Sequence, residues 1–95
     1  MTGPVDITLL TQTSCGLCDV AKEILTRIGQ EHPLRVTEID LASPQGRELA
    51  AAAGLLFAPG VLLDGQPFSH GRLSERKLRR ALVVRQRAGS LSDRG

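Results

Sequence analysis

The chain has 95 residues and a net charge of +2, which suits one domain with a single core and leaves no room for a second domain. Two Phe and no Trp or Tyr make that core aliphatic. The N-terminus lacks the basic and apolar regions of a signal peptide, and no apolar run approaches the roughly 18 residues of a membrane span. We expect a cytoplasmic protein that does not enter a membrane. In that reducing compartment two cysteines indicate redox or metal chemistry rather than a structural disulfide.

The first third of the chain predicts a βαβ unit. The apolar run 6–10 is typical of a buried strand, and the apolar spacing over 15–28 predicts a helix that ends at Gly29. The run 34–40 predicts a second strand. A strand, a helix and a strand in so short a segment require parallel strands and a right-handed crossover.

The second helix begins at a clear capping signal. Ser43 is typical of an N-cap and Pro44 of a first helical position, where the missing N–H of proline costs nothing. Gly54 is placed to end this helix. Its inward face includes Gly46 and Ala50, and such small residues favour close packing on a sheet.

A hairpin and a third helix complete the domain. Asp64-Gly65 between the runs 61–63 and 66–69 is a strong hairpin signal, and Pro67 predicts that the last strand is an edge. Ser74 is expected to cap a helix that runs to about Arg87. The sequence therefore predicts an α/β domain over 5–87 in the order β-α-β-α-β-β-α, followed by a disordered tail over 88–95.

The two cysteines occupy positions 15 and 18, where the first strand passes into the first helix. The unpaired N–H groups and the positive dipole end of that helix favour a thiolate, and in such a setting the pKa of a cysteine falls from roughly 8.5 to about 3.5–7.5. We predict that Cys15 is the nucleophile. Cys18, one helical turn further on, lies within disulfide reach and resolves a mixed disulfide formed at Cys15.

Other interpretations of the pair are a chance spacing or half of a metal site. A structural zinc needs four ligands, and the other candidates, His32 and His70, do not have zinc-finger spacing. We therefore expect no metal ligands. Two neighbours of the pair are candidate modulators, Ser14 and Asp19. Asp19 either complements the helix dipole or influences proton transfer at Cys18.

A cysteine pair at the first strand-to-helix junction of such a chain resembles the glutaredoxin-like branch of the thioredoxin superfamily, most closely its proteins with Cys-x-Leu-Cys-Asp. The resemblance covers residues 6 to about 84 and rests on three stretches, Cys15-Gly16-Leu17-Cys18, Ala58-Pro59 and Gly71-Arg72. It implies a thioredoxin-like, glutaredoxin-type fold, with a four-stranded mixed sheet flanked by three helices. It also implies a thiol–disulfide oxidoreductase.

The resemblance assigns a substrate-binding role to two further stretches. In the family the proline is cis and its loop lies beside the cysteines, so we expect a cis Ala58-Pro59 bond and an Ala58 backbone offered to a bound peptide or thiol. The other interpretation is an ordinary loop proline. Gly71 and Arg72 precede the last helix, whose N–H groups together with Arg72 would hold a substrate carboxylate. A solvated Arg72 is the alternative.

The recycling thiol is not specified by the motif. Typical glutathione-using glutaredoxins have a basic residue ahead of the first cysteine, an aromatic residue near the pair and a Gly-Gly-Asp stretch before the last helix. The corresponding stretches of this sequence, 10–12, 16–17 and 70–74, lack these three features. We expect no cofactor beyond the redox-active disulfide, with glutathione or another small thiol as a candidate reductant. The substrate is a disulfide-containing protein or a small thiol, and a reductase or thiol recycles the pair. A non-catalytic module that binds a metal or iron–sulfur cluster, or that docks on a partner, is the alternative function.

The charge is uneven along the chain. Residues 1–71 carry four basic and eight acidic side chains, whereas residues 72–87 carry seven basic and one acidic. Without aromatic residues for base stacking or a recognition motif, the basic segment does not indicate nucleic-acid binding. We expect a solvated helix face that steers an acidic protein partner, on a protein that is a monomer.

Overall fold

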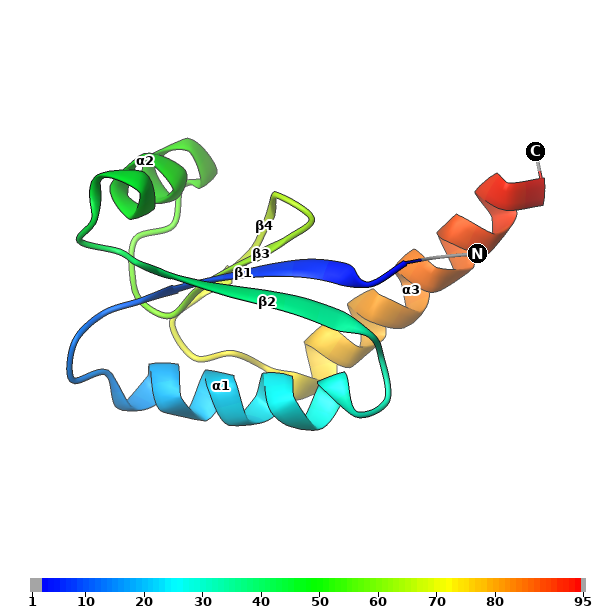
Figure 1. Cartoon of the computed structure of the whole chain (residues 1–95), viewed down its shortest axis with the longest axis horizontal. Helices are drawn as coiled ribbons and strands as arrows, with labels where there is room; N and C mark the ends of the chain where they lie inside the picture. The colour runs from blue at the N-terminus through cyan, green and yellow to red at the C-terminus, as the bar shows by residue number, and fades with distance from the viewer. Residues whose placement is uncertain (1–2, 95) are drawn as a thin grey trace.

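A computed structural model of the chain describes residues 3–94, and for residues 88–94 only the backbone. Four strands and three helices follow one another in the predicted order (Figure 1). Their bounds are β1 Val5–Thr11, α1 Gly16–Gly29, β2 Leu34–Asp40, α2 Pro44–Ala53, β3 Gly60–Leu63, β4 Gln66–His70 and α3 Glu75–Arg94.

The strands form one mixed sheet in the order β2-β1-β3-β4. β1 runs parallel to β2 and antiparallel to β3, and β3 runs antiparallel to β4. The predicted parallel pair and the predicted edge position of Pro67 are therefore confirmed. Asp64 and Gly65 both have positive φ, 47° and 82°, which is the backbone of a tight hairpin turn whose twist matches the strands.

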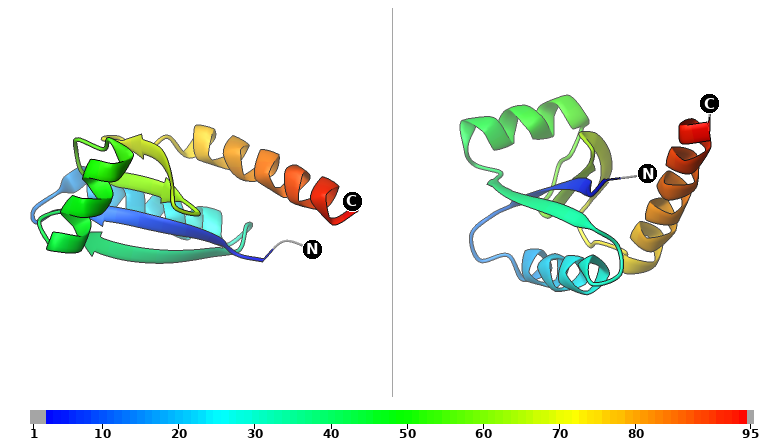
Figure 2. Two further views of the ribbon diagram at one scale, coloured as in Figure 1. Left: turned by 90° about the horizontal axis from the view of Figure 1, so that it is seen from above. Right: turned by 45° about the vertical axis from the view of Figure 1, so that its right-hand side comes forward.

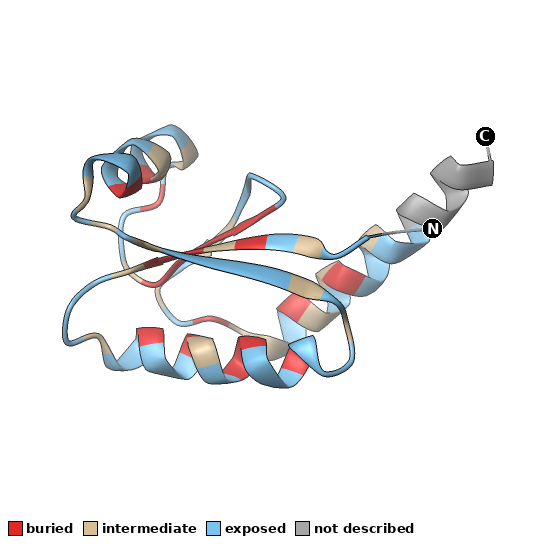
Figure 3. Ribbon diagram, in the orientation of Figure 1, coloured by how far each residue is buried: buried red, intermediate tan, exposed pale blue. Residues whose placement is uncertain are grey.

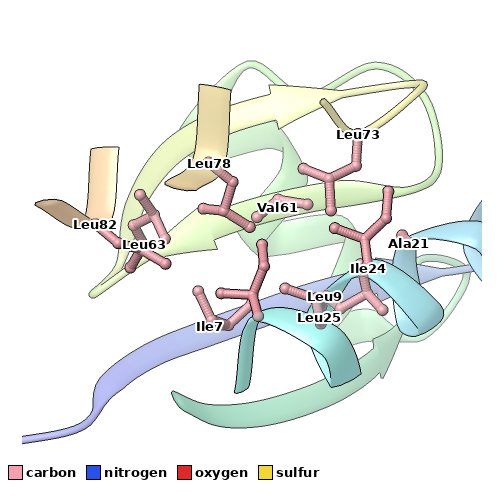
Figure 4. Packing of buried hydrophobic residues seen from close by; sticks show 11 residues of the cluster. Ile7, Leu9, Ala21, Ile24, Leu25, Val61, Leu63, Leu73, Leu78 and Leu82 are labelled. Carbon is pink, nitrogen blue, oxygen red and sulfur yellow. The ribbon is translucent and has the colours of Figure 1, made fainter. Parts of the chain in front are cut away.

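The helices cover both faces of the sheet. α2 lies on the opposite side from α1, as the views of Figures 1 and 2 show. The larger core fills the space between the sheet, α1 and α3 (Figure 4). Its fully buried members include Ile7, Leu9, Ile28, Val61 and Leu78. A smaller core of Leu10, Ala50, Leu55 and Leu62 joins the other face to α2. Both cores are aliphatic, as the composition predicts, and the edge strand β2 is largely exposed (Figure 3).

The capping predictions are confirmed at α2. The Ser43 side chain accepts a hydrogen bond from the Gly46 N–H at 3.0 Å, Pro44 lies in the first turn, and Gly54 adopts a left-handed φ of 70°. α1 ends at Gly29 as predicted, but by another route. The next residue, Gln30, stays right-handed, and the N–H groups of residues 30–32 satisfy the last carbonyls of the helix.

The last helix is longer than predicted. Ser74 caps it through a hydrogen bond from the Lys77 N–H to Oγ at 3.2 Å, as expected, but the helix continues past Arg87 to Arg94. No proline interrupts residues 88–94, so the backbone of the expected tail keeps its helical hydrogen bonds; Gly95 lies outside the described residues. Within residues 3–94, no helix combines the length and the hydrophobicity that a membrane span needs.

Candidate active site

Cys15 and Cys18 lie at the start of α1. Cys15 is the N-cap, with extended backbone, and its Sγ accepts a hydrogen bond from the Cys18 N–H at 3.1 Å. The two cysteines form a disulfide, with their Cα atoms 5.2 Å apart. Cys18 is only 2% exposed, whereas Cys15 is half-buried. Cys15 is therefore the more accessible of the two cysteines, and its sulfur accepts a hydrogen bond from a backbone N–H in the first turn of the helix.

Ser14 and Asp19 flank the pair, and Ser14 has an unusual backbone conformation. Ser14 has a left-handed φ of 56°, a conformation that most side chains disfavour. It directs the chain from the end of β1 into the helix start. Asp19 is exposed in the first turn of α1, and its backbone N–H bonds to the Cys15 carbonyl at 3.3 Å. A carboxylate at this place complements the helix dipole.

The Pro59 loop reaches the same end of the sheet. The register of the central pair sets Gly60 opposite Leu10, near the point where β1 leads toward Cys15. The Ala58-Pro59 peptide bond is cis, as predicted, and Pro59 is fully buried. Ala58 is half-buried, and its main chain makes no hydrogen bond with the backbone of residues 3–94 or with a described side chain.

Gly71 contacts the Pro59 loop directly, and Arg72 follows it in the chain with an exposed side chain. The Gly71 N–H donates to the Pro59 carbonyl at 3.0 Å, so the segment before α3 is tied to the proline loop. Arg72 is exposed and forms no ion pair with the described side chains. Its predicted contact with a substrate carboxylate stays a prediction.

One further contact at this corner was not predicted from the sequence. His70 follows the predicted strand run 66–69 but is the last residue of β4, and its Nδ1 accepts a hydrogen bond from the Leu56 N–H at 2.8 Å. The His70 ring also lies against Phe57, with 5.6 Å between ring centroids. Leu56 and Phe57 are 72% and 63% exposed. No sequence motif signals this contact, because it joins residues that only the fold brings together.

The known proteins that resemble this chain define its family. Residues 6–83 match the family model of the glutaredoxin-like domain (DUF836). The chain belongs to this family. The comparison with curated proteins found no relative of this glutaredoxin-like domain.

Solved structures confirm the predicted thioredoxin-like fold of the glutaredoxin-like domain. A mutant thioredoxin from Halobacterium salinarum NRC-1 has a TM-score of 0.64 and 21% identity, with 84% of this chain and 73% of that chain covered. The oxidized form of mitochondrial thioredoxin 3 from Saccharomyces cerevisiae has a TM-score of 0.62 and 20% identity, with 87% and 80% covered. A structure described as a malarial protein has a TM-score of 0.62 and 15% identity, with 87% and 97% covered.

A surface pocket of the glutaredoxin-like domain includes Gln12, three residues before Cys15. Its other lining residues are Leu41 and Ala42, which follow β2, and Arg47 of α2. Its one cation, Arg47, is exposed. Within the described residues, no group of three or more His, Cys, Asp or Glu side chains is arranged to hold a metal ion.

A cluster of four charged side chains joins α1 to α3. The Glu75 carboxylate accepts hydrogen bonds from Arg27 at 2.8 Å and from Arg79 at 3.0 and 3.1 Å, and Arg79 also pairs with Glu31. The hydrogen bond from Arg27, followed by that from Arg79, lowers the pKa of Glu75. All four side chains are on or next to the two helices, so this cluster belongs to the scaffold.

Proposed function

We propose that this glutaredoxin-like domain is a thiol–disulfide oxidoreductase that uses Cys15 and Cys18 as a dithiol. The observation that carries the proposal is the asymmetry of the pair. The half-buried Cys15 receives the Cys18 N–H at 3.1 Å, whereas Cys18 is buried one turn deeper. A hydrogen bond from a backbone N–H and the helix dipole both stabilise a thiolate, which is the attacking form of the residue.

Reduction of a substrate proceeds in two exchanges. The Cys15 thiolate attacks one sulfur of the substrate disulfide, and the other substrate sulfur leaves as a thiolate that takes up a proton. The Cys18 thiol then loses its proton and attacks the Cys15 sulfur, which releases the second substrate thiol. Two electrons have passed to the substrate, and the Cys15–Cys18 disulfide is the oxidised product.

The Pro59 loop supplies the substrate-binding edge. The Ala58 main chain forms no hydrogen bond with the backbone of residues 3–94 or with a described side chain, and it lies toward the end of the sheet from which β1 leads to the cysteines. A substrate segment in extended form can pair with it, as an added strand does. The substrate is a protein disulfide or a mixed disulfide of a small thiol. Glutathione, another cytoplasmic thiol or a reductase regenerates the dithiol.

The test is the reduction of a protein disulfide such as that of insulin by the pre-reduced protein. We expect turnover by the wild type and none by Cys15→Ser. Cys18→Ser should instead accumulate a mixed disulfide on Cys15 that mass spectrometry detects. Absence of reduction by the wild type, or full activity of Cys15→Ser, would exclude the proposed reaction.

The same preparation tests the alternative of a metal-binding or cluster-binding module. After anaerobic purification, visible absorbance or stoichiometric metal that is lost in Cys15→Ser would favour that function. A colourless, metal-free protein with disulfide reductase activity supports the redox function.

A further inference from the structure

We propose that His70 is a positioning residue of the Pro59 loop, and that it presents Leu56 and Phe57 to the substrate. We call these two exposed residues the apolar pair. The inference rests on the proposed function and adds a preference to it. The favoured substrate is a peptide or protein disulfide with an apolar side chain next to the half-cystine that Cys15 attacks.

The His70 contact defines the loop. Nδ1 accepts the Leu56 N–H at 2.8 Å, so this ring nitrogen acts as the acceptor that fixes the Leu56 backbone. The ring face is tilted by 57° to Phe57 with 5.6 Å between centroids, a usual distance for aromatic contact. The His70 side chain thus contacts both members of the apolar pair, the backbone of Leu56 and the ring of Phe57.

The rest of the loop is anchored on either side of the apolar pair. Before it, the Leu55 N–H bonds to the Ala50 carbonyl at 2.9 Å, and the Leu55 side chain is buried. After it, the Pro59 carbonyl accepts from the Gly71 N–H. Among the described residues, His70 makes the only hydrogen bond to the stretch 56–58 between these anchors. If the acceptor nitrogen of His70 were removed, no hydrogen bond among the described residues would hold the backbone of Leu56 and Phe57 in place.

The exposure of the apolar pair indicates which kind of substrate side chain binds to it. Two large apolar side chains in succession, 72% and 63% exposed, contribute little to the core. They directly precede Ala58, whose main chain is proposed to pair with the substrate. A substrate strand that pairs there places its neighbouring side chains over Leu56 and Phe57. An apolar side chain would bury surface that both partners otherwise expose to water.

Three substitutions of His70 test whether the hydrogen-bond acceptor, rather than the bulk of the ring, is what the loop requires. In asparagine, Oδ1 is bonded to Cγ, as Nδ1 is in histidine, so His70→Asn keeps an acceptor at the same place. In His70→Gln the acceptor lies one bond further out, and His70→Ala removes it. Each variant is first shown to be folded by circular dichroism and by its unfolding transition.

The kinetic test uses two disulfide-linked peptide dimers that differ in one residue beside the half-cystine, Leu in one and Ser in the other. For the Leu peptide we expect His70→Ala and His70→Gln to raise KM about 2- to 10-fold, the equivalent of one hydrogen bond, with kcat within about twofold. For the Ser peptide KM should change less. His70→Asn should bring KM for the Leu peptide back toward the wild-type value, because it keeps the acceptor although it lacks the ring that contacts Phe57.

Amide hydrogen exchange of Leu56 gives a readout that needs no activity. Exchange should be faster in His70→Ala and His70→Gln than in the wild type and His70→Asn, because only the latter two retain the acceptor. Unchanged exchange in His70→Ala, equal rescue by glutamine and asparagine, or equal KM effects on both peptides would each overturn the inference. A wild-type protein that reduces neither peptide overturns the proposed function, whereas an active wild type with KM insensitive to His70→Ala overturns only the inference.

Discussion

The Gly71 N–H donates to the carbonyl of the cis proline Pro59 at 3.0 Å, and Gly71 holds a left-handed φ of 81° to do so. A Cβ at this position meets no atom within 4 Å, so a substitution by alanine is disfavoured only by the left-handed backbone conformation. Gly65 in the hairpin turn has the same φ, 82°, and the same open space. We expect Gly71→Ala and Gly65→Ala each to lower the free energy of unfolding by about 1–2 kcal/mol, as measured by urea denaturation.

Activity should tell the two glycine variants apart. Gly71→Ala disturbs the Pro59 loop and should raise KM for a disulfide substrate about 2- to 10-fold, the equivalent of one hydrogen bond. Gly65→Ala alters a turn on the β3–β4 hairpin and should leave KM as it is in the wild type. Equal KM values in the two variants would contradict a role for the Gly71–Pro59 contact in substrate binding.

Gly46 is required by close packing of α2. A Cβ on Gly46 would overlap the Asp40 carbonyl and approach the Leu41 Cα to 2.9 Å. That carbonyl also accepts hydrogen bonds from the N–H and Oγ–H of Ser43, the cap of α2. We expect Gly46→Ala to lower the free energy of unfolding by about 3 kcal/mol, because the overlap involves backbone that cannot move freely.

Gly29→Ala is the matched control for this steric effect. Gly29 also belongs to a helix, but a Cβ there meets nothing within 4 Å and its φ is not left-handed. We expect a gain of about 0.5 kcal/mol, since alanine favours the helix and restricts the unfolded chain. A comparable loss of stability in both variants, measured by urea denaturation, would show that the Asp40 contact is not the cause.

Asp19 is predicted to act on the helix rather than on the reaction. It is exposed in the first turn of α1, where a negative charge complements the helix dipole. Asp19→Asn should lower the free energy of unfolding by about 0.3–1 kcal/mol at low salt, and less at high salt. The pH dependence of the reduction rate should not change. A shifted profile would instead assign Asp19 to proton transfer at Cys18.

The lowered pKa of Glu75 predicts an acid-sensitive junction between α1 and α3. Its carboxylate is hydrogen-bonded by Arg27 and Arg79, so its pKa is lower in the folded state than in the unfolded state. The ion pairs of Glu75 therefore stabilise the fold fully at pH values above the pKa of glutamate in the unfolded chain, about 4.3. This stabilisation is lost as the pH falls through the lower pKa of Glu75 in the folded protein.

Denaturation at two pH values measures this effect. Glu75→Gln should be less stable than the wild type at pH 7, and the difference should shrink at a pH low enough to protonate Glu75 in the folded protein. Glu48→Gln is the control, because Glu48 is exposed on α2 and pairs with no described cation. If the Glu75→Gln deficit is independent of pH, the ion pairs do not cause it.

The features of this domain that depend on neighbouring residues could be predicted from the sequence. The order of the elements, the Ser43 cap and the Asp64-Gly65 turn depend on neighbouring residues and on the period of the apolar pattern, so they were predictable. The spacing of Cys15 and Cys18 was equally informative, because it places both in one helical turn. The end of α3 was predicted too early, since Gly89 and the small polar residues around it are typical of a helix end, whereas the helix continues to Arg94.

The contacts between distant residues at the corner near the cysteines could not be predicted, because folding alone brings these residues together. The pairing of Gly60 with Leu10, the bond from Gly71 to Pro59 and the contact of His70 with Leu56 join segments far apart in the chain. Such contacts leave no periodic trace in a single sequence. The asymmetry between buried Cys18 and half-buried Cys15 likewise arises from packing of α1 on the sheet, which the spacing of the two residues does not encode.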